Sequence, residues 1–519
     1  MSFFRRIASH ACMAAITVAF TCQGVAGTTE PQQRDFFQPV LETDATSPSL
    51  QRGGETIPLR PEMLVNEDDD VTIPQVSQVV LSNGMRVFAL ESRESPSLYF
   101  TIFFKGGSFL DPGDKVGLAT LTAAAWRAVG TASLSPDDFD LKLDEIGSQL
   151  SISAERNMLR LDMFALSEKR SEALALLEEL LLHPAFNEKQ FEQRKALKLE
   201  ELRRENDEPS DVARREFRKE LYGAENPLGR IPTTATVSSI ALKDVKSFYD
   251  ANIAPSVCWF GVAGDADEAE ATKWVEEKFG SWNKPTPPVA ALPEPVDVES
   301  SRPEILLIPR RTAQSQIRLG HLSIPRNSPL VIPAEVMSSI YGMSGFSSRL
   351  LTEVRTKRGF AYAVGGGVLP DEPRGIFFAV AGSKTASTCA ALNTMLEVTS
   401  ATAAGIFSPK ELEIARREVV HGFITKFDVP HKILANRMSY DLLGYPSDFI
   451  DKFVERVRAV SAEDVTNAAK EIIRPSRLRI LVVGNPSSMD CDLNQVGNVT
   501  VRLLEPADAA LLNRESDGN

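Results

Sequence analysis

The clearest local pattern in the chain is an apolar run, a tight turn and a second apolar run near residue 80. The apolar run 79–81 is followed by Ser82-Asn83-Gly84, and the mainly apolar stretch 85–89 comes directly after it. An Asn-Gly pair between two such runs is the strongest short-range signal for a β-hairpin, because both residues accept the positive φ of a type I′ turn. The apolar run 98–105 then continues the predicted sheet.

Helical and strand patterns follow one another over the next hundred residues. Ser135-Pro136-Asp137-Asp138 is typical of a helix N-terminus, with a capping hydroxyl, a proline in the first turn and acids near the positive end of the helix dipole. This helix is expected to extend to Gly147. Residues 149–154 and 158–165 alternate apolar and polar positions as an antiparallel pair, and long helical patterns follow at 168–182 and 187–205. The order predicts an α+β class, with an antiparallel-rich sheet and helices packed on one side.

The chain contains this pattern twice. A separation of 220 residues relates Asp244 to Asp464, Pro255 to Pro475, and Gly264 to Gly484, in matching local contexts. A repeated separation at ordered positions predicts an internal duplication. The prediction concerns the fold of the two copies and carries no information about their chemistry.

Changes in composition divide the chain into segments. Residues 28–75 are rich in Pro, Gln, Asp, Ser and Thr, which predicts a disordered tether. Prolines cluster again after Asn283, which predicts a stiff linker. The predicted segments are a signal peptide, 1–27, the tether, 28–75, a first folded domain, 76–283, the linker, 284–303, a second folded domain, 304–500, and a tail, 501–519.

The composition disfavours some classes of function. The chain has 519 residues, of which 43% are hydrophobic, so it can bury large cores. Its formal charge of -13 disfavours nucleic-acid binding, because neutralising phosphates requires clustered Lys and Arg. The five cysteines, Cys12, Cys22, Cys258, Cys389 and Cys491, are widely spaced and show neither a zinc-knuckle spacing nor a disulfide framework. Cysteine chemistry is therefore not expected to matter.

The N-terminus has the pattern of an export signal. Arg5 and Arg6 precede a short apolar run at 14–20, and small residues follow at 24–27. This pattern predicts a secretory signal peptide and a periplasmic or envelope-associated location. The apolar run is shorter than the roughly 20 residues of a spanning helix, so no transmembrane span is expected. Lipid attachment at Cys22 remains an alternative, although the residues before it match a lipobox poorly.

Three further stretches carry a family resemblance. Residues 139–147 fit the pattern Tyr/Phe-x-x-x-Leu-Asp-x-Ile-Gly, residues 182–186 read Leu-His-Pro-Ala-Phe, and residues 200–203 read Glu-Glu-Leu-Arg. With the order of elements, these stretches make residues 76–485 resemble the M16 peptidases, the family of pitrilysin, insulinase and mitochondrial processing peptidase. The resemblance implies two duplicated M16-like domains.

The resemblance also implies a zinc site, and here its ligands are missing. In the family, a Gly-Leu-Ala-His-x-x-Glu-His helix supplies two zinc ligands and a general base, since residues at i and i+4 share one helix face. In this chain Gly117-Leu118-Ala119 is followed by Thr120, Ala123 and Ala124 at the His, Glu and His positions. Glu201 stands at the third-ligand position, but one carboxylate alone does not hold zinc at useful affinity. No metal is therefore expected on this chain, and Glu201 is expected to lie on a solvated helix face.

The remaining histidines do not form a replacement ligand set in the sequence. They are isolated from one another and show neither an HxxEH motif nor its inverse, and each is expected to be a capping, core or surface residue: His183, His321, His421 and His431.

A second motif region keeps the features that the family places opposite the zinc helix. Residues 347–358 are helical by composition, Gly359 is a natural end for that helix, and 360–367 has a strand pattern. Arg355 therefore ends a helix and Tyr362 lies on a strand. The resemblance implies that this pair acts on substrate, with the Tyr hydroxyl stabilising an oxyanion and the Arg fork holding a carbonyl or carboxylate. The alternatives are an ordinary surface cation near a helix C-terminus and a packed aromatic side chain.

Two functions from different classes follow from these expectations. The first is the metal-free subunit of a heterodimeric M16-type zinc metallopeptidase, in which Arg355 and Tyr362 serve a homologous HxxEH-containing partner that carries the zinc. Extended peptide substrates would add as a strand to a sheet edge. The second is a non-catalytic M16-like scaffold that binds peptides or holds an envelope complex together.

Overall fold

The computed structural model describes residues 49–52, 55–58, 72–288, 291–345 and 347–512, all within a compact unit that begins at Asp35. The predicted signal peptide, Cys22 and most of the predicted tether lie outside the described residues. Within the tether, β1 (Ser49–Arg52) and β2 (Glu55–Pro58) pair as a short antiparallel ladder. Among the described residues, no helix combines the length and apolar character needed to cross a bilayer.

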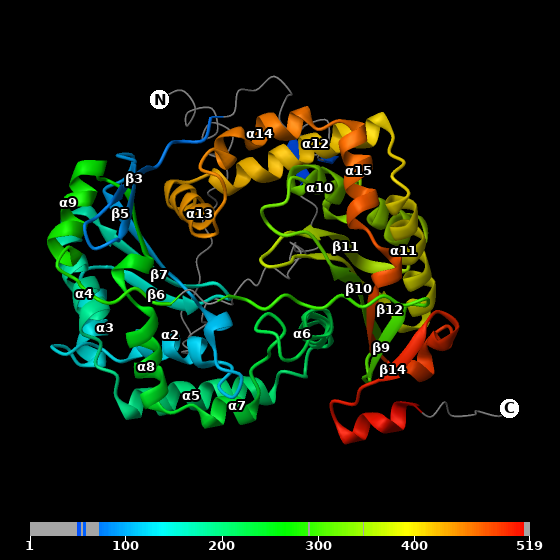
Figure 1. Cartoon of the computed structure of the whole chain (residues 1–519), viewed down its shortest axis with the longest axis horizontal. Coiled ribbons are helices and arrows are strands. Elements are labelled where there is room, and N and C mark those ends of the chain that lie inside the picture. Colours follow the sequence, from blue (N-terminus) through cyan, green and yellow to red (C-terminus); the bar gives the residue numbers. More distant parts are fainter. Residues whose placement is uncertain (1–48, 53–54, 59–71, 289–290, 346, 513–519) are drawn as a thin grey trace. The chain divides into compact units, whose positions relative to one another are not determined.

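The first half of the chain contains a mixed six-stranded sheet with the order β3-β4-β8-β5-β7-β6 (Figure 1). Strands β4 and β8 are parallel, and every other neighbouring pair in this sheet is antiparallel. The predicted Asn-Gly hairpin is confirmed, because β3 and β4 pair across a turn in which Gly84 has φ 88°. The strands are β3 (Ser77–Val80), β4 (Arg86–Glu91), β5 (Ser97–Lys105), β6 (Gln149–Ala154), β7 (Met158–Leu166) and β8 (Cys258–Gly264).

Amphipathic helices bury one face of this sheet. The Ser135 hydroxyl accepts a 3.1 Å hydrogen bond from the Asp138 amide, which confirms the predicted cap of α3. Trp126 of α2 is fully buried beside Phe104, and its indole N–H donates to the Leu180 carbonyl at 2.9 Å. The helices of this half are α2 (Leu118–Ala128), α3 (Pro136–Glu145), α4 (Arg170–Leu182), α5 (Glu188–Arg203), α6 (Pro209–Tyr222), α7 (Thr234–Ser239), α8 (Leu242–Asn252) and α9 (Glu268–Phe279).

The second half repeats this architecture in a six-stranded sheet with the order β11-β12-β10-β13-β9-β14. Its first five strands from β11 have the same order and the same pairing directions as β6, β7, β5, β8 and β4. The predicted α+β class and the predicted duplication of the fold are confirmed. The strands are β9 (Glu304–Pro309), β10 (Gln314–Leu322), β11 (Ala361–Leu369), β12 (Ile376–Lys384), β13 (Arg479–Gly484) and β14 (Asn498–Val501).

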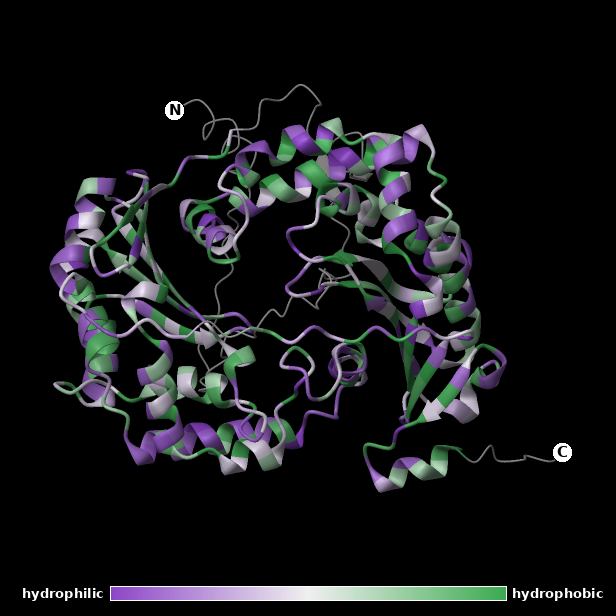
Figure 2. Ribbon diagram, viewed as in Figure 1, coloured by the Kyte–Doolittle hydropathy of each residue, from purple (hydrophilic) through white to green (hydrophobic). Residues whose placement is uncertain are grey.

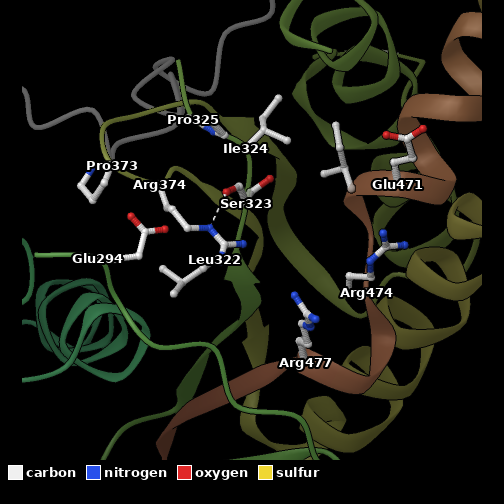
Figure 3. A pocket seen from close by; sticks show the side chains of 11 residues that line it. Glu294, Leu322, Ser323, Ile324, Pro325, Pro373, Arg374, Glu471, Arg474 and Arg477 are labelled. Atoms are coloured by element: carbon white, nitrogen blue, oxygen red, sulfur yellow. Dashed lines mark hydrogen bonds between the residues drawn. The ribbon is translucent and has the colours of Figure 1, made fainter. Parts of the chain in front are cut away.

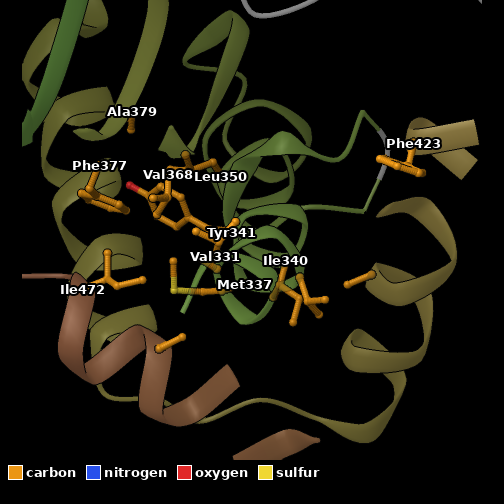
Figure 4. Close-up of a cluster of buried hydrophobic side chains, with 14 of the residues drawn as sticks. Val331, Met337, Ile340, Tyr341, Leu350, Val368, Phe377, Ala379, Phe423 and Ile472 are labelled. Carbon is orange, nitrogen blue, oxygen red and sulfur yellow. The ribbon is translucent and has the colours of Figure 1, made fainter. Parts of the chain in front are cut away.

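The helices of the second half enclose the larger apolar core. Figure 4 shows part of it, where Tyr341 and Phe377 lie among aliphatic side chains, with their ring centroids 5.1 Å apart. Helix α5 of the first half, in contrast, is largely hydrophilic in Figure 2. The helices of the second half are α10 (Val331–Ser338), α11 (Thr388–Ala403), α12 (Pro409–Ile424), α13 (Pro430–Leu442), α14 (Phe449–Ala459) and α15 (Ala462–Ile472).

Each half also places one helix on the sheet of the other half. Helix α6 buries Phe217 and Leu221 against residues of the second sheet, including Phe378. Helix α13 packs on the first sheet at β8, where a Cβ on Gly261 would lie 2.3 Å from the Met438 sulfur. The glycine therefore permits a close approach that a larger residue would prevent. In this way a helix from the other half covers the second face of each sheet.

The expectation that cysteine chemistry plays no part is wrong. Cys389, at the start of α11, and Cys491, after β13, form a disulfide with a Cα–Cα distance of 6.0 Å. The two residues are 102 positions apart. The pair escaped prediction because spacing rules detect cysteines that are close in sequence, whereas the fold brings these two together. Among the described residues, the buried Cys258 is the free cysteine.

Candidate functional site

The helix at the expected zinc position begins with a buried carboxylate as its cap. The Asp111 side chain accepts hydrogen bonds from the Gly117 amide at 2.7 Å and the Ala119 amide at 2.8 Å. Gly117 has φ 106°, a conformation that favours glycine. Burial raises the pKa of Asp111 to about 6, while the backbone hydrogen bonds act in the opposite direction. Sequence reasoning missed this residue, whose only local signal is an acid shortly before a glycine that opens a helix.

The face of α2 that would carry ligands offers none for zinc. Thr120 and Ala124 are half-buried, and Ala123 is 2% exposed. Glu201 lies on α5, with 68% of its side chain exposed, and pairs with Lys198 at 2.7 Å. This confirms the predicted solvated helix face. Across the part of the chain that the structure describes, no group of three or more His, Cys, Asp or Glu side chains could hold a metal ion.

The segment that carries Arg355 is a helix of unusual geometry. Residues Leu351–Lys357 form a π-helix, where an α-helix was expected. Its end follows the prediction, since Gly359 has φ 65° and its amide donates to the Arg355 carbonyl at 2.9 Å. A π-helical turn is rare and occurs frequently at functional sites. After the helix ends at Lys357, strand β11 begins at Ala361.

Tyr362 lies at an irregularity in the edge strand of the second sheet. The register of β11 against β12 shifts between Ala361 and Ala363, so Tyr362 has no partner in the ladder. The residue is 55% exposed, although tyrosine is usually packed on one side in a strand. A bulge of this kind redirects a side chain away from the regular alternation of the strand.

Neighbouring charges in this region are paired, whereas the two candidate residues are not. Lys357 pairs with Glu353 at 2.7 Å, and Arg358 lies 3.4 Å from the same carboxylate. The Arg355 side chain is exposed and, within the described residues, neither Arg355 nor Tyr362 has a side-chain hydrogen bond or ion pair. Both groups are therefore available to a ligand.

A carboxylate and a set of hydroxyls hold the loop before this segment. Glu418 of α12 accepts hydrogen bonds from Ser339 at 2.9 Å, from Ser344 at 2.7 Å and from Ser347 at 3.1 Å. Arg349 donates to Glu411 at 2.7 Å, which ties the start of the helix to α12. These bonds restrict the loop and the helix that carries Arg355.

Strand β11 contains three consecutive glycines, Gly365, Gly366 and Gly367, and another segment of the chain packs closely against them. A Cβ on Gly342 would lie 2.5 Å from the Gly366 amide nitrogen, and a Cβ on Gly367 would lie 2.7 Å from Met343. The π-helical segment Ser339–Met343 therefore approaches the strand backbone closely. The structure thus shows that glycines in this strand allow a close approach of the chain to itself.

His321 and His431 have ordinary structural roles. His321 is 1% exposed, its Nδ1 lies 2.7 Å from the Leu322 carbonyl and its Nε2 accepts from the Arg474 amide at 3.0 Å. Burial lowers its pKa to about 4, so the ring is neutral at physiological pH. His431 stacks on Tyr99 with ring centroids 4.5 Å apart. Both are core or packing residues, as predicted.

The described part of the chain is thus a duplicated α+β fold, in which helix α2 of the first copy carries no metal-ligand set and the second copy exposes the Arg355 and Tyr362 side chains. Two family descriptions match the sequence, "Insulinase (Peptidase family M16)" over residues 86–231 and "Peptidase M16 inactive domain" over residues 239–419. The chain belongs to the M16 peptidase family.

Comparisons with individual proteins agree with this membership. The chain is 24% identical over 401 residues to the "Uncharacterized zinc protease YmxG" of Bacillus subtilis strain 168, covering 76% of this chain and 95% of that protein. It is also 24% identical over 277 residues to the "Non-peptidase homolog YmxG" of Helicobacter pylori, covering 53% and 62%. The crystal structure of a peptidase M16 inactive domain from Pseudomonas fluorescens matches with a TM-score of 0.71 and 23% identity, covering 79% of this chain and 98% of that one.

Proposed function

We propose that this protein is the metal-free subunit of a heterodimeric M16-type zinc metallopeptidase. The observation that carries the proposal is the contrast between its two copies of the fold. The first copy has Thr120, Ala123 and Ala124 at the ligand and base positions. The second has Arg355 and Tyr362, which are exposed and form no side-chain pair with any residue that the structure describes. These two side chains can act in peptide hydrolysis only if a homologous chain with an HxxEH helix supplies the zinc.

In this proposal Arg355 and Tyr362 act on a peptide held by the partner. The partner's zinc would polarise the attacked carbonyl and activate a water molecule. The Tyr362 hydroxyl would donate a hydrogen bond to the oxyanion, and the planar guanidinium of Arg355 would hold a neighbouring carbonyl or carboxylate of the substrate. Neither role requires a metal on this chain.

The proposed substrates are extended peptides in an exported compartment. An extended peptide can pair with an exposed sheet edge through its backbone, which gives affinity with little dependence on sequence. The strands β6 and β11 are edges of the two sheets. A periplasmic or envelope location fits the Cys389–Cys491 disulfide, because disulfides persist in oxidising compartments.

The experiment that tests the proposal is a reconstitution with an HxxEH homologue from the same genome. With the pair assembled, Tyr362→Phe and Arg355→Ala should each lower kcat by roughly 100-fold or more, while zinc content and assembly stay unchanged. Arg203→Ala is a matched control, because its side chain is 72% exposed on α5 and pairs with its helix neighbour Glu200. Turnover that is unaffected by either site variant would exclude the proposed role.

The second candidate is a non-catalytic M16-like scaffold that binds peptides. The Helicobacter pylori relative is named a non-peptidase homolog, which favours this alternative. The same reconstitution distinguishes the scaffold from the peptidase subunit. A scaffold would bind peptides or an envelope partner, and peptide hydrolysis by any zinc-bearing homologue would not depend on its presence.

A further inference from the structure

A cavity of about 400 Å³ lies at the end of β10, and its charges are balanced by groups of the chain itself (Figure 3). Arg374 and Arg477, which line it, both pair with Asp297 at 2.9 Å. Glu294 and Glu471 add two carboxylates to the lining. The cavity therefore does not favour an anion. The outer edge of the same sheet, in contrast, offers backbone groups that other strands leave free.

Strand β14 forms this edge of the second sheet, beside β9 (Figure 1). The two strands are parallel, and the Asn498 and Arg502 amides donate to backbone carbonyls in and next to β9 at 2.8 and 2.9 Å. Because the backbone groups of successive residues in a strand point to opposite sides, those of Val499, Val501 and Leu503 point away from β9. Among the described residues, no strand pairs with β14 on that side. The edge can therefore accept one more strand.

The side chains along this edge do not prevent strand pairing. Proteins usually protect an edge strand with lysine, proline or an inward-pointing charge. Here Val501 is 42% exposed and Leu503 is 43% exposed, whereas Val499 packs on the core. Arg502 is the single charged residue in the stretch 498–504, and two carboxylates of α6 hold its guanidinium at 2.8 and 2.6 Å. An exposed apolar edge of this kind favours association with another strand.

The order of residues along the edge is self-complementary about Val501. In an antiparallel pair of two copies centred there, Val501 lies opposite its own counterpart, and Val499 lies opposite Leu503 because both are two residues from the centre. Arg502 lies opposite Thr500, so like charges do not meet. The outward backbone groups find partners, and apolar side chains meet apolar side chains. A different partner would have to supply this pattern, whereas a second copy supplies it by symmetry.

We propose that two copies of this chain associate through β14, in an antiparallel pair centred on Val501 that makes their second sheets continuous. Because β14 has four residues, we expect a weak dimer, with a Kd of about 1–100 µM. Strand β11, which carries Tyr362, is the opposite edge of this sheet and stays free in both copies. The association does not depend on a zinc-bearing partner or on peptide hydrolysis.

The test is sedimentation velocity of the purified full chain at increasing concentration. The wild type should shift from monomer to dimer across about 1–100 µM. Val501→Lys should remain a monomer, because it places two lysines opposite each other at the centre of the strand pair. Val80→Lys is the matched control. Val80 is 60% exposed on β3, an edge strand of the first sheet, so this variant should form the dimer as the wild type does.

A charge exchange tests the centre of the contact. Val501→Glu alone should also be monomeric, whereas an equimolar mixture with Val501→Lys should restore the dimer, because glutamate and lysine then face each other across the two strands. Restoration also shows that both variants are folded. A wild type that stays monomeric, a dimer that survives Val501→Lys, the loss of the dimer in Val80→Lys, or a mixture that stays monomeric would each overturn the proposal.

Discussion

Replacing Cys389 and Cys491 together by serine should destabilise the second half of the protein measurably. In the chain-entropy description, a disulfide stabilises the folded state by restricting the unfolded chain, and the effect grows with the length of the closed loop. The bond joins residues 102 positions apart. A loop of this length corresponds to about 4.7 kcal/mol, and measured losses for native disulfides are about 2–5 kcal/mol.

The assay is urea unfolding of the oxidised wild type, the reduced wild type and the double serine variant, followed by limited proteolysis to locate the change. Reduction should lower the unfolding midpoint of the wild type to near that of the variant, and should leave the variant itself unaffected. Proteolysis should accelerate after β13, where the bond holds the chain to α11. A chain without residues 1–27 should show one reactive thiol when denatured, from Cys258, and three after reduction.

Equal unfolding midpoints for the oxidised and reduced wild type would refute the reasoning. Three reactive thiols before reduction would show that the bond does not form in the purified protein. Either result would also remove the support that the disulfide gives to an oxidising compartment.

Two further substitutions test features of the fold. Gly261→Ala should lower the free energy of unfolding in urea by about 1–3 kcal/mol, because the new Cβ would meet the Met438 sulfur at 2.3 Å. Adding Met438→Ala to the same chain should recover part of this loss. An unchanged free energy of unfolding in Gly261→Ala would contradict the close approach of α13. Asp111→Asn should alter the pH dependence. The folded pKa of about 6 lies above the ordinary 3.8, so the carboxyl contributes stability that is complete below pH 3.8 and is lost as pH rises through 6. Between pH 7 and pH 5 the wild type should gain about 1.3 kcal/mol from this group, and the same gain in the variant would contradict its buried state.

The parts of the fold that depend on neighbouring residues could be predicted from the sequence. The Asn-Gly hairpin and the Ser135 cap each follow from interactions within four residues. The duplication was visible because the two copies still share residues at a constant separation. The π-helix at Leu351–Lys357 could not be predicted, since its hydrogen-bond pattern leaves no trace in composition.

Features that join distant parts of the chain could not be read from the sequence. The partner of Cys389 lies 102 residues away, and the covering of each sheet by a helix of the other half depends on tertiary packing. For the candidate site, the family resemblance led to the expectation that Thr120, Ala123 and Ala124 stand at the ligand and base positions and that Arg355 and Tyr362 form the candidate pair. The structure adds that Arg355 and Tyr362 are exposed and, among the residues it describes, unpaired, and their action on a substrate remains a prediction.

The crossing of α6 and α13 has a consequence for dissecting the protein. A gene cut in the proline-rich segment would yield two fragments, each with one sheet face deprived of its cover, because the covering helix would be encoded on the other fragment. Neither fragment is therefore expected to fold as a self-contained unit, in spite of the internal repeat. Co-expression of both fragments is the form in which a split version of this protein would be recovered.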